Sequence, residues 1–188
     1  MSYYTKEELI SAGFSSVGEN VKISNKTSLY SISGSIGSNV RVDDFCILKG
    51  NIIFASYNHV AAFCMLSGMC GKITLQECAT LSSGVHIYTG SDDYSANVLS
   101  SSTVPQEYTK TIKGDVYLGY GAIVGCQSVL LPKALLEDGA SVGAHCVVYS
   151  RVPAGAVIVS GVIKSVNVKT RDVGIIKQYI KLLTSIKK

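Results

Sequence analysis

The sequence predicts an all-β solenoid of short strands, because bulky apolar residues recur every six positions over most of the chain. A repeat of six fits neither a helix, with its period of about 3.6 residues, nor a flat strand, with its period of about 2. The repeat positions are Val17, Ile23 and Leu29; Ile36, Val42, Leu48, Phe54, Val60 and Leu66; Leu75, Leu81 and Ile87; and Leu118, Val124, Leu130, Leu136, Val142 and Val148. Each would fill the middle of one face, so three repeats make a coil of 18 residues.

The fourth residue after each repeat position is small in nearly every case. These residues are Val40, Cys46, Asn58, Cys64, Cys70, Ala79, Ala122, Ser128, Ala134, Ala140 and Cys146, with Ile52 and Val85 as bulkier exceptions. A small side chain fits inside a corner, where the backbones of successive strands crowd together. We therefore expect parallel strands stacked about 4.8 Å apart, with Cys46 and Cys64 one above the other as core residues inside one corner.

A helix is expected at each end of the solenoid. Thr5 and Glu8 form a capping box that starts a short helix, and residues 1–16 are the expected N-terminal cap. After Asp172, apolar residues recur at helical spacing with lysines opposite them, which predicts a C-terminal helix within 169–188. Exposed solenoid ends would template the pairing of further strands, so we expect these helices to cover the ends.

The repeat breaks strongly once. The solenoid is expected to span 17–168, with an excursion at 88–115. The regular phase resumes at Leu118, so the excursion is an insertion at a corner. A long stretch of this kind inside a compact domain is usually functional.

The composition excludes several classes of protein. Of the 188 residues, 47% are hydrophobic and 16% are charged, which argues against disorder. A net charge of +4 is too mild to indicate nucleic acid as a partner. The sequence lacks an apolar run long enough for a membrane span and a secretory signal at its start. Its six cysteines form no CxxC motif, so we expect no metal site and a cytoplasmic location.

With these features the sequence resembles the hexapeptide-repeat acyltransferases, over about residues 15–170. The segments VYLGYGAIVGCQSVLLPKALLEDGASVGAHCVV and LSSGVHIYTG resemble the branch of maltose and galactoside acetyltransferases. SYNHVAAF, SDDYS and TVPQEYT resemble a branch often found among surface-polysaccharide genes. The resemblance implies a left-handed parallel β-helix and an acetyl-CoA-dependent acetyltransferase. The acceptor would be a hydroxyl or amino group of a sugar or nucleotide sugar in polysaccharide or glycan precursor synthesis.

Acyl transfer from a thioester to a hydroxyl needs a base that removes the hydroxyl proton, and histidine has the best-placed pKa. The chain has three histidines, at positions 59, 86 and 145. His59 and His86 both precede an inward position, so each should point outward at a corner. We rank His59 first as the base and His86 second, while a histidine that serves only a subunit contact remains an alternative. An amine acceptor would need no strong base, because a neutral amine is already nucleophilic.

The resemblance also assigns acceptor and coenzyme positions. In the maltose and galactoside branch the base is a histidine that aligns with Asp92 here, and an acceptor-binding asparagine aligns with about Ala61. In the polysaccharide branch a histidine stands where His59 is, followed by a loop that matches Asp92, Asp93, Tyr94 and Ser95. Asp92 or Asp93 would orient the imidazole or hold a sugar hydroxyl or amino group.

Coenzyme A is expected along the late coils. The positions that the resemblance assigns to it are Gly125, Cys126, Gly143, Ala144, Ser160, Gly161 and Lys164. Lys164 and Arg151 could meet phosphates as charged donors. The proline that usually stands in this last segment is missing, which leaves the adenine contacts open. Relatives are trimers with sites between subunits, so a homotrimer is expected.

Two other functions are compatible with a solenoid of this kind. A zinc carbonic anhydrase on this fold needs three convergent histidines, whereas the histidines here are 27 and 59 residues apart. A degenerate solenoid would serve only as a scaffold or carbohydrate-binding protein. Saturable binding of coenzyme A separates the transferase from that scaffold.

Overall fold

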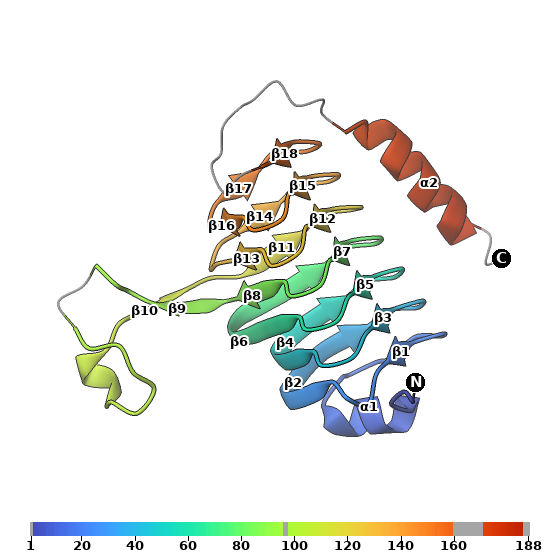
Figure 1. Ribbon diagram of the computed structural model, residues 1–188. Coiled ribbons are helices and arrows are strands. Elements are labelled where there is room, and N and C mark those ends of the chain that lie inside the picture. Colours follow the sequence, from blue (N-terminus) through green and yellow to red (C-terminus); the bar gives the residue numbers. More distant parts are fainter. Residues whose placement is uncertain (1, 96–97, 160–170, 186–188) are drawn as a thin grey trace.

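The protein is a tapering stack of about seven coils, with a hairpin projecting from one side and a helix lying beside another (Figure 1). The structure is a computed structural model that describes residues 2–95, 98–159 and 171–185. It is the left-handed parallel β-helix that the family resemblance implies, with a helix near each end. Within the described residues, no helix is both long and apolar enough to pass through a membrane.

One face of the solenoid is a seven-stranded parallel sheet. Its strands, in order, are β1 (Lys22–Ile23), β3 (Arg41–Val42), β5 (His59–Val60), β7 (Thr80–Leu81), β12 (Ile123–Val124), β15 (Ser141–Val142) and β18 (Val157–Ile158). We call the turns that follow this face the first corner, which comprises residues 24–27, 43–46, 61–64, 82–85, 125–128 and 143–146. Each turn of the first corner leads into the second face.

The second and third faces belong to one continuous sheet, because three early strands bend around the corner between them. These long strands are β2 (Ser28–Ile36), β4 (Ile47–Phe54) and β6 (Met65–Leu75). The later coils use separate short strands: β8 (His86–Tyr88), β13 (Val129–Leu130) and β16 (Val147–Val148) on the second face, and β11 (Val116–Leu118), β14 (Leu135–Leu136) and β17 (Arg151–Val152) on the third. We call the bend between them the second corner: residues 49–51, 67–72, 89–115, 131–134 and 149–150.

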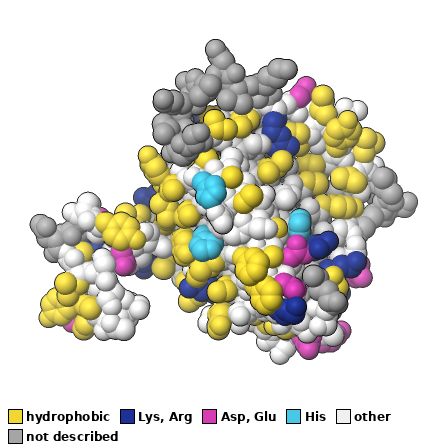
Figure 2. Space-filling model, in the orientation of Figure 1, with side chains coloured by type: hydrophobic (Ala, Val, Ile, Leu, Met, Phe, Trp, Pro, Cys, Tyr) yellow, Lys and Arg dark blue, Asp and Glu magenta, His cyan; other side chains and the backbone are white. Residues whose placement is uncertain are grey.

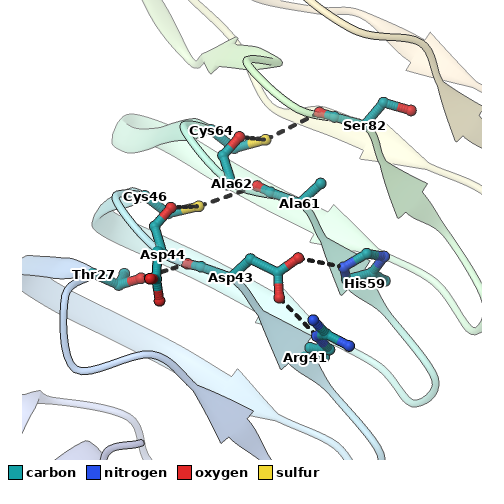
Figure 3. Close-up of polar contacts among 10 residues, drawn as sticks. All are labelled: Thr27, Arg41, Asp43, Asp44, Cys46, His59, Ala61, Ala62, Cys64 and Ser82. Atoms are coloured by element: carbon teal, nitrogen blue, oxygen red, sulfur yellow. Dashed lines mark hydrogen bonds and ion pairs between the residues drawn. The ribbon is translucent and has the colours of Figure 1, made fainter. Parts of the chain in front are cut away.

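The predicted core is confirmed. Every repeat position is buried except Leu29, which is partly buried and packs against the same core. Cys46 and Cys64 are each 1% exposed, and their thiols donate across the first corner to the carbonyls of Ala61 and Ser82, both at 3.2 Å (Figure 3). Their assignment as small core residues is therefore confirmed.

Cys70 is exposed, contrary to its predicted place inside a corner. Strand β6 carries three additional residues at the second corner, because Gly50 pairs with Gly68 whereas Asn51 pairs with Lys72. The inward position falls instead to Ile73, which is fully buried and pairs with Ile52.

The excursion leaves the second corner as an antiparallel hairpin (Figure 1). It consists of β9 (Gly90–Asp92), β10 (Thr111–Lys113) and, beyond them, the short 3-10 helix η1 (Gln106–Tyr108). The solenoid then resumes in register, since Val116 of β11 pairs with Ile73 of β6.

The two helices lie in different places. Helix α1 (Lys6–Ala12) begins at Thr5 with the predicted capping box and lies below the first coils (Figure 1). Helix α2 (Val173–Ser185) does not cover the far end as expected. It lies along the third corner, the turns that lead back to the first face at 37–40, 55–58, 76–79, 119–122, 137–140 and 153–156.

Two glycines of the third corner make room for α2. A Cβ at Gly121 or Gly139 would approach Ile176 to 2.6 or 2.9 Å. The helix is also held by an ion pair of 2.6 Å between Lys177 and Asp138, and the Tyr57 hydroxyl donates to the Leu183 carbonyl at 3.1 Å.

Candidate active site

The candidate base residues flank the first corner. His59 lies on β5 just before the corner, and His86 lies on β8 just after it, one coil later. Histidine side chains surface on the face shown in Figure 2, with hydrophobic, acidic and basic side chains beside them. We call the outer edge formed by the stacked turns of the first corner the ridge. The two histidines therefore border this ridge from opposite faces.

His59 is held by a carboxylate. Its Nε2 lies 2.9 Å from Asp43, which also accepts a hydrogen bond of 2.7 Å from Arg41 (Figure 3). Burial acts to raise the pKa of Asp43, but the hydrogen bonds from His59 and Arg41 outweigh it and hold that pKa below its ordinary value. With Asp43 at Nε2, the Nδ1 atom has no partner among the described residues.

His86 has neutral neighbours instead. Its Nδ1 lies 3.2 Å from the Tyr88 hydroxyl, which also donates to the Met65 sulfur at 3.6 Å. Burial raises the pKa of Tyr88, so this hydroxyl stays protonated at neutral pH. A carboxylate therefore fixes His59, whereas a phenol fixes His86.

The expected coenzyme positions share the upper first corner. Gly125 and Cys126 lie in one coil, and Gly143 and Ala144 lie directly above them in the next, since Val124 pairs with Val142. A Cβ at Gly125 would come within 2.6 Å of the Gly143 and Ala144 backbone, so glycine lets these coils touch. The two turns consequently pack closely, with Cys126 and Ala144 exposed beside the glycines.

The remaining coenzyme positions are less informative. Ser160, Gly161 and Lys164 lie outside the described residues. Arg151 forms an ion pair of 2.7 Å with Glu137 on the third face and is 64% exposed. Among residues 2–95, 98–159 and 171–185, no group of three potential metal ligands comes together.

The acidic positions lie at the second corner, at the base of the hairpin. Asp93 accepts hydrogen bonds from Ser95, through its hydroxyl at 2.6 Å and its amide at 3.0 Å, and pairs with Lys110 at 2.9 Å. The Ser95 hydroxyl, with the help of Lys110, lowers the pKa of Asp93 from 3.8 to about 2. Asp93 therefore anchors the excursion.

Asp92 is the available carboxylate. Within the described part of the chain, no side-chain hydrogen bond or ion pair engages it. Asp92 and Tyr94 both line two hollows of about 460 and 420 Å³ beside the hairpin. Tyr94 is 86% exposed, so it is open to a ligand or a neighbouring molecule.

The structure does not join these two groups of residues. In the described residues, neither Asp92 nor Asp93 contacts an imidazole, and the residue that orients His59 is Asp43. Sequence reasoning missed Asp43, although the coil register offers a signal. Arg41 pairs with His59, and Asp43 follows Arg41 by two residues on the same outward side of the strand.

The chain is similar to a dTDP-4-amino-4,6-dideoxy-D-glucose acyltransferase from Escherichia coli, with 44% identity over 152 residues that make up 79% of each protein. It is also similar to the crystal structure of AntD, an N-acyltransferase from Bacillus cereus, in complex with dTDP and 3-hydroxybutyryl-CoA. That match has a TM-score of 0.89 and 36% identity over 100% of this chain and 99% of AntD. A mutant of AntD in complex with dTDP-4-amino-4,6-dideoxyglucose and coenzyme A gives a TM-score of 0.88 and 36% identity over 98% of both chains.

No protein-family model matches the chain. Identity to the curated relative over most of both proteins nevertheless shows the family, and the shared solenoid agrees with it. The chain belongs to the hexapeptide-repeat acyltransferases, and it is an acyl-CoA-dependent enzyme that transfers the acyl group to a sugar.

Proposed function

We propose that this enzyme acylates the amino group of dTDP-4-amino-4,6-dideoxyglucose or a closely related nucleotide sugar, with acetyl-CoA as the acyl donor. The observation that carries the proposal is the similarity, over nearly the whole chain, to an N-acyltransferase in complex with that sugar and coenzyme A. The E. coli relative is named for the same sugar. An activated sugar of this kind is a precursor for polysaccharide assembly, which supports a role in glycan precursor synthesis.

We also propose that the active enzyme is a homotrimer with its sites between protomers. Its candidate base and coenzyme positions lie at the first corner, and its candidate amine-binding carboxylate lies at the second. A threefold arrangement lets the second corner of one protomer meet the first corner of the next. The projecting hairpin supports this arrangement, because it extends away from its own solenoid (Figure 1).

In the proposed reaction, the sugar amine attacks the thioester carbonyl of acyl-CoA. A C–N bond forms, the C–S bond breaks, and the proton lost from nitrogen ends on the sulfur of coenzyme A. Asp92 holds the amine, with Asp93 and Tyr94 shaping the loop around it. The neutral amine attacks without a strong base, and the nitrogen becomes positively charged as the C–N bond forms. His59 then takes the proton at Nδ1, because Asp43 occupies Nε2, and passes it to the departing sulfur. His86 is the second candidate for this role.

The coenzyme would follow the first corner upward along Gly125, Cys126, Gly143 and Ala144. The lack of side chains at Gly125 and Gly143 supports this path, because a pantetheine arm can lie close to the backbone there. Ser160, Gly161 and Lys164 complete the proposed coenzyme site. All six cysteines are free thiols, which supports a reducing cytoplasmic location.

The test is a transfer assay with acetyl-CoA and dTDP-4-amino-4,6-dideoxyglucose, with the N-acylated sugar detected by mass spectrometry. Product should form with the wild-type enzyme, and Asp92→Asn should lower the rate about 100-fold, as for the loss of a strong hydrogen bond to a charged group. Glu107→Gln is the matched control, since Glu107 is an exposed acid of the same excursion. Absence of product with an enzyme that binds coenzyme A would refute the proposed acceptor.

A further inference from the structure

A single column of residues runs along the first corner. In successive coils, Ile47, Met65, His86, Val129 and Val147 are paired neighbours, and Ser28 pairs with Ile47 below them. The residue two positions earlier in each coil occupies the same place in its turn. From bottom to top, the column reads Lys26, Phe45, Phe63, Gly84, Gln127 and His145.

The lower half of the column is an exposed aromatic stack. The rings of Phe45 and Phe63 lie 5.3 Å apart between centroids, with an interplanar angle of 20°. The Lys26 ammonium lies 5.3 Å from the Phe45 ring centroid. Phe45 is 52% exposed and Phe63 is 61% exposed, so two large rings that could pack in a core stand in solvent instead. The described residues offer no aromatic partner for the upper face of Phe63.

We call each position of the column a rung. The rung directly above Phe63 is Gly84, which adds no side chain to the column. Its backbone is left-handed, with a φ of 71°, but Phe45, Phe63, Gln127 and His145 hold φ values of 55–63° with side chains in place. This turn therefore does not require glycine. A Cβ at Gly84 would lie 3.2 Å from Cγ of the flexible Gln127 side chain, which would have to shift slightly, and 3.8 Å from the Gln127 backbone nitrogen.

The glycine leaves one position of the column without a side chain. Successive rungs are about 4.8 Å apart, so Phe63 and Gln127 are separated by about twice that distance. A planar group stacked on Phe63 would fill the space that a side chain at position 84 would otherwise take. This place lies on the ridge between His59 and His86.

We infer that the upper face of Phe63, left open by Gly84, is the platform on which the thymine base of the nucleotide sugar stacks. The inference rests on the proposed function, which supplies a planar base as part of the acceptor. Base stacking on an aromatic ring is favourable and needs no hydrogen-bond partners. An exposed phenylalanine supplies the ring face and nothing else.

The first experiment measures dTDP binding by calorimetry to the wild-type enzyme and to Phe63→Leu. The variant should bind dTDP about 5-fold to 100-fold more weakly, as expected for the loss of one stacked base. Tyr30→Leu is the matched control, because Tyr30 is a 55% exposed aromatic residue of β2 outside the column. With 2-deoxyribose 5-diphosphate, which lacks the base, Phe63→Leu and the wild type should bind equally.

The second experiment fills the rung. Gly84→Phe should fold, since Phe45 and Phe63 adopt the same backbone conformation at the equivalent places. It should lose dTDP binding while its oligomeric mass and melting temperature stay close to those of the wild type.

The outcomes separate the two proposals. If the wild type binds dTDP and Phe63→Leu binds it equally well, the platform is refuted and the proposed acceptor stands. If the wild type fails to bind dTDP, the proposed acceptor fails and the platform fails with it. A change of oligomeric mass in Phe63→Leu would assign the ring to a subunit contact and refute the platform.

Discussion

The first and second corners receive the same strands from the same coils, yet they are built differently. At the first corner every turn from 43–46 to 143–146 has the same length and a left-handed residue at the same place. At the second corner β6 gains three residues, and the next coil inserts the whole hairpin. Uniform turns form a straight ridge on which a long ligand can lie, whereas variable turns supply individual side chains.

The variable corner does not disturb the uniform one. After the hairpin, β11 resumes its pairing with β6, and β12 resumes its pairing with β7. In a solenoid each coil needs only its neighbours in register, so an insertion at one corner leaves the stacking of the other intact. Binding surfaces at the two corners can therefore change independently.

The largest effect is expected when the two corners are impaired in different protomers. Ala144→Phe obstructs the coenzyme ridge at an exposed position, and Asp92→Asn removes the carboxylate of the hairpin. Each variant alone should be inactive. Co-expressed at equal levels, the two should recover about a quarter of the wild-type activity, because one in four random trimer contacts joins two intact halves. An inactive mixture of confirmed mixed trimers would place the whole site within one protomer.

A smaller effect distinguishes the two sides of the ridge. His59→Ala should lower kcat/KM at least ~100-fold with the trimer intact, the usual contribution of a general base. His86→Ala serves as the matched variant and should cost less, because no carboxylate fixes its ring. Both rates come from steady-state assays, with mass measured by light scattering. A near-native rate for His59→Ala would reject its role as the base.

The smallest effect concerns the anchoring of the hairpin. The pKa of Asp93 is lowered from 3.8 to about 2. Its anchoring contribution is therefore present above pH 3.8 and lost as the pH falls toward 2. Amide exchange at Ser95, which donates to Asp93, should lose protection in acid relative to its intrinsic rate.

The amide of Phe63 is the control for this measurement, because it donates to the Asp44 carbonyl within the first corner. Its protection should persist over the same range of pH. Equal losses at Ser95 and Phe63 would indicate general unfolding and contradict a local anchor.

The sequence predicts the solenoid well because its core is repetitive. Each repeat position, such as Leu66 or Leu118, points inward by the same rule. The rule fails where the count is interrupted, as at Cys70, because three additional residues between Leu66 and Leu75 cannot be assigned to a turn or a strand without the register.

The candidate site is less predictable because it depends on contacts between coils. His59 is conspicuous in the sequence, but its partner Asp43 is 16 residues earlier and becomes visible only when strands are paired. The place of α2 depends on a contact of the same kind. Its apolar stripe predicts a helix, whereas the room for Ile176 is created by Gly121 and Gly139 in two different coils.

Helix α2 also changes how such a stack comes apart. A solenoid whose coils touch only their neighbours can fray from its free end, one layer at a time. Here α2 contacts Asp138 in the upper coils and Tyr57 in a much lower coil, so it connects coils that are not adjacent. Unfolding of the upper coils therefore requires these contacts of α2 to break. Unfolding becomes more cooperative than the repeat alone would allow.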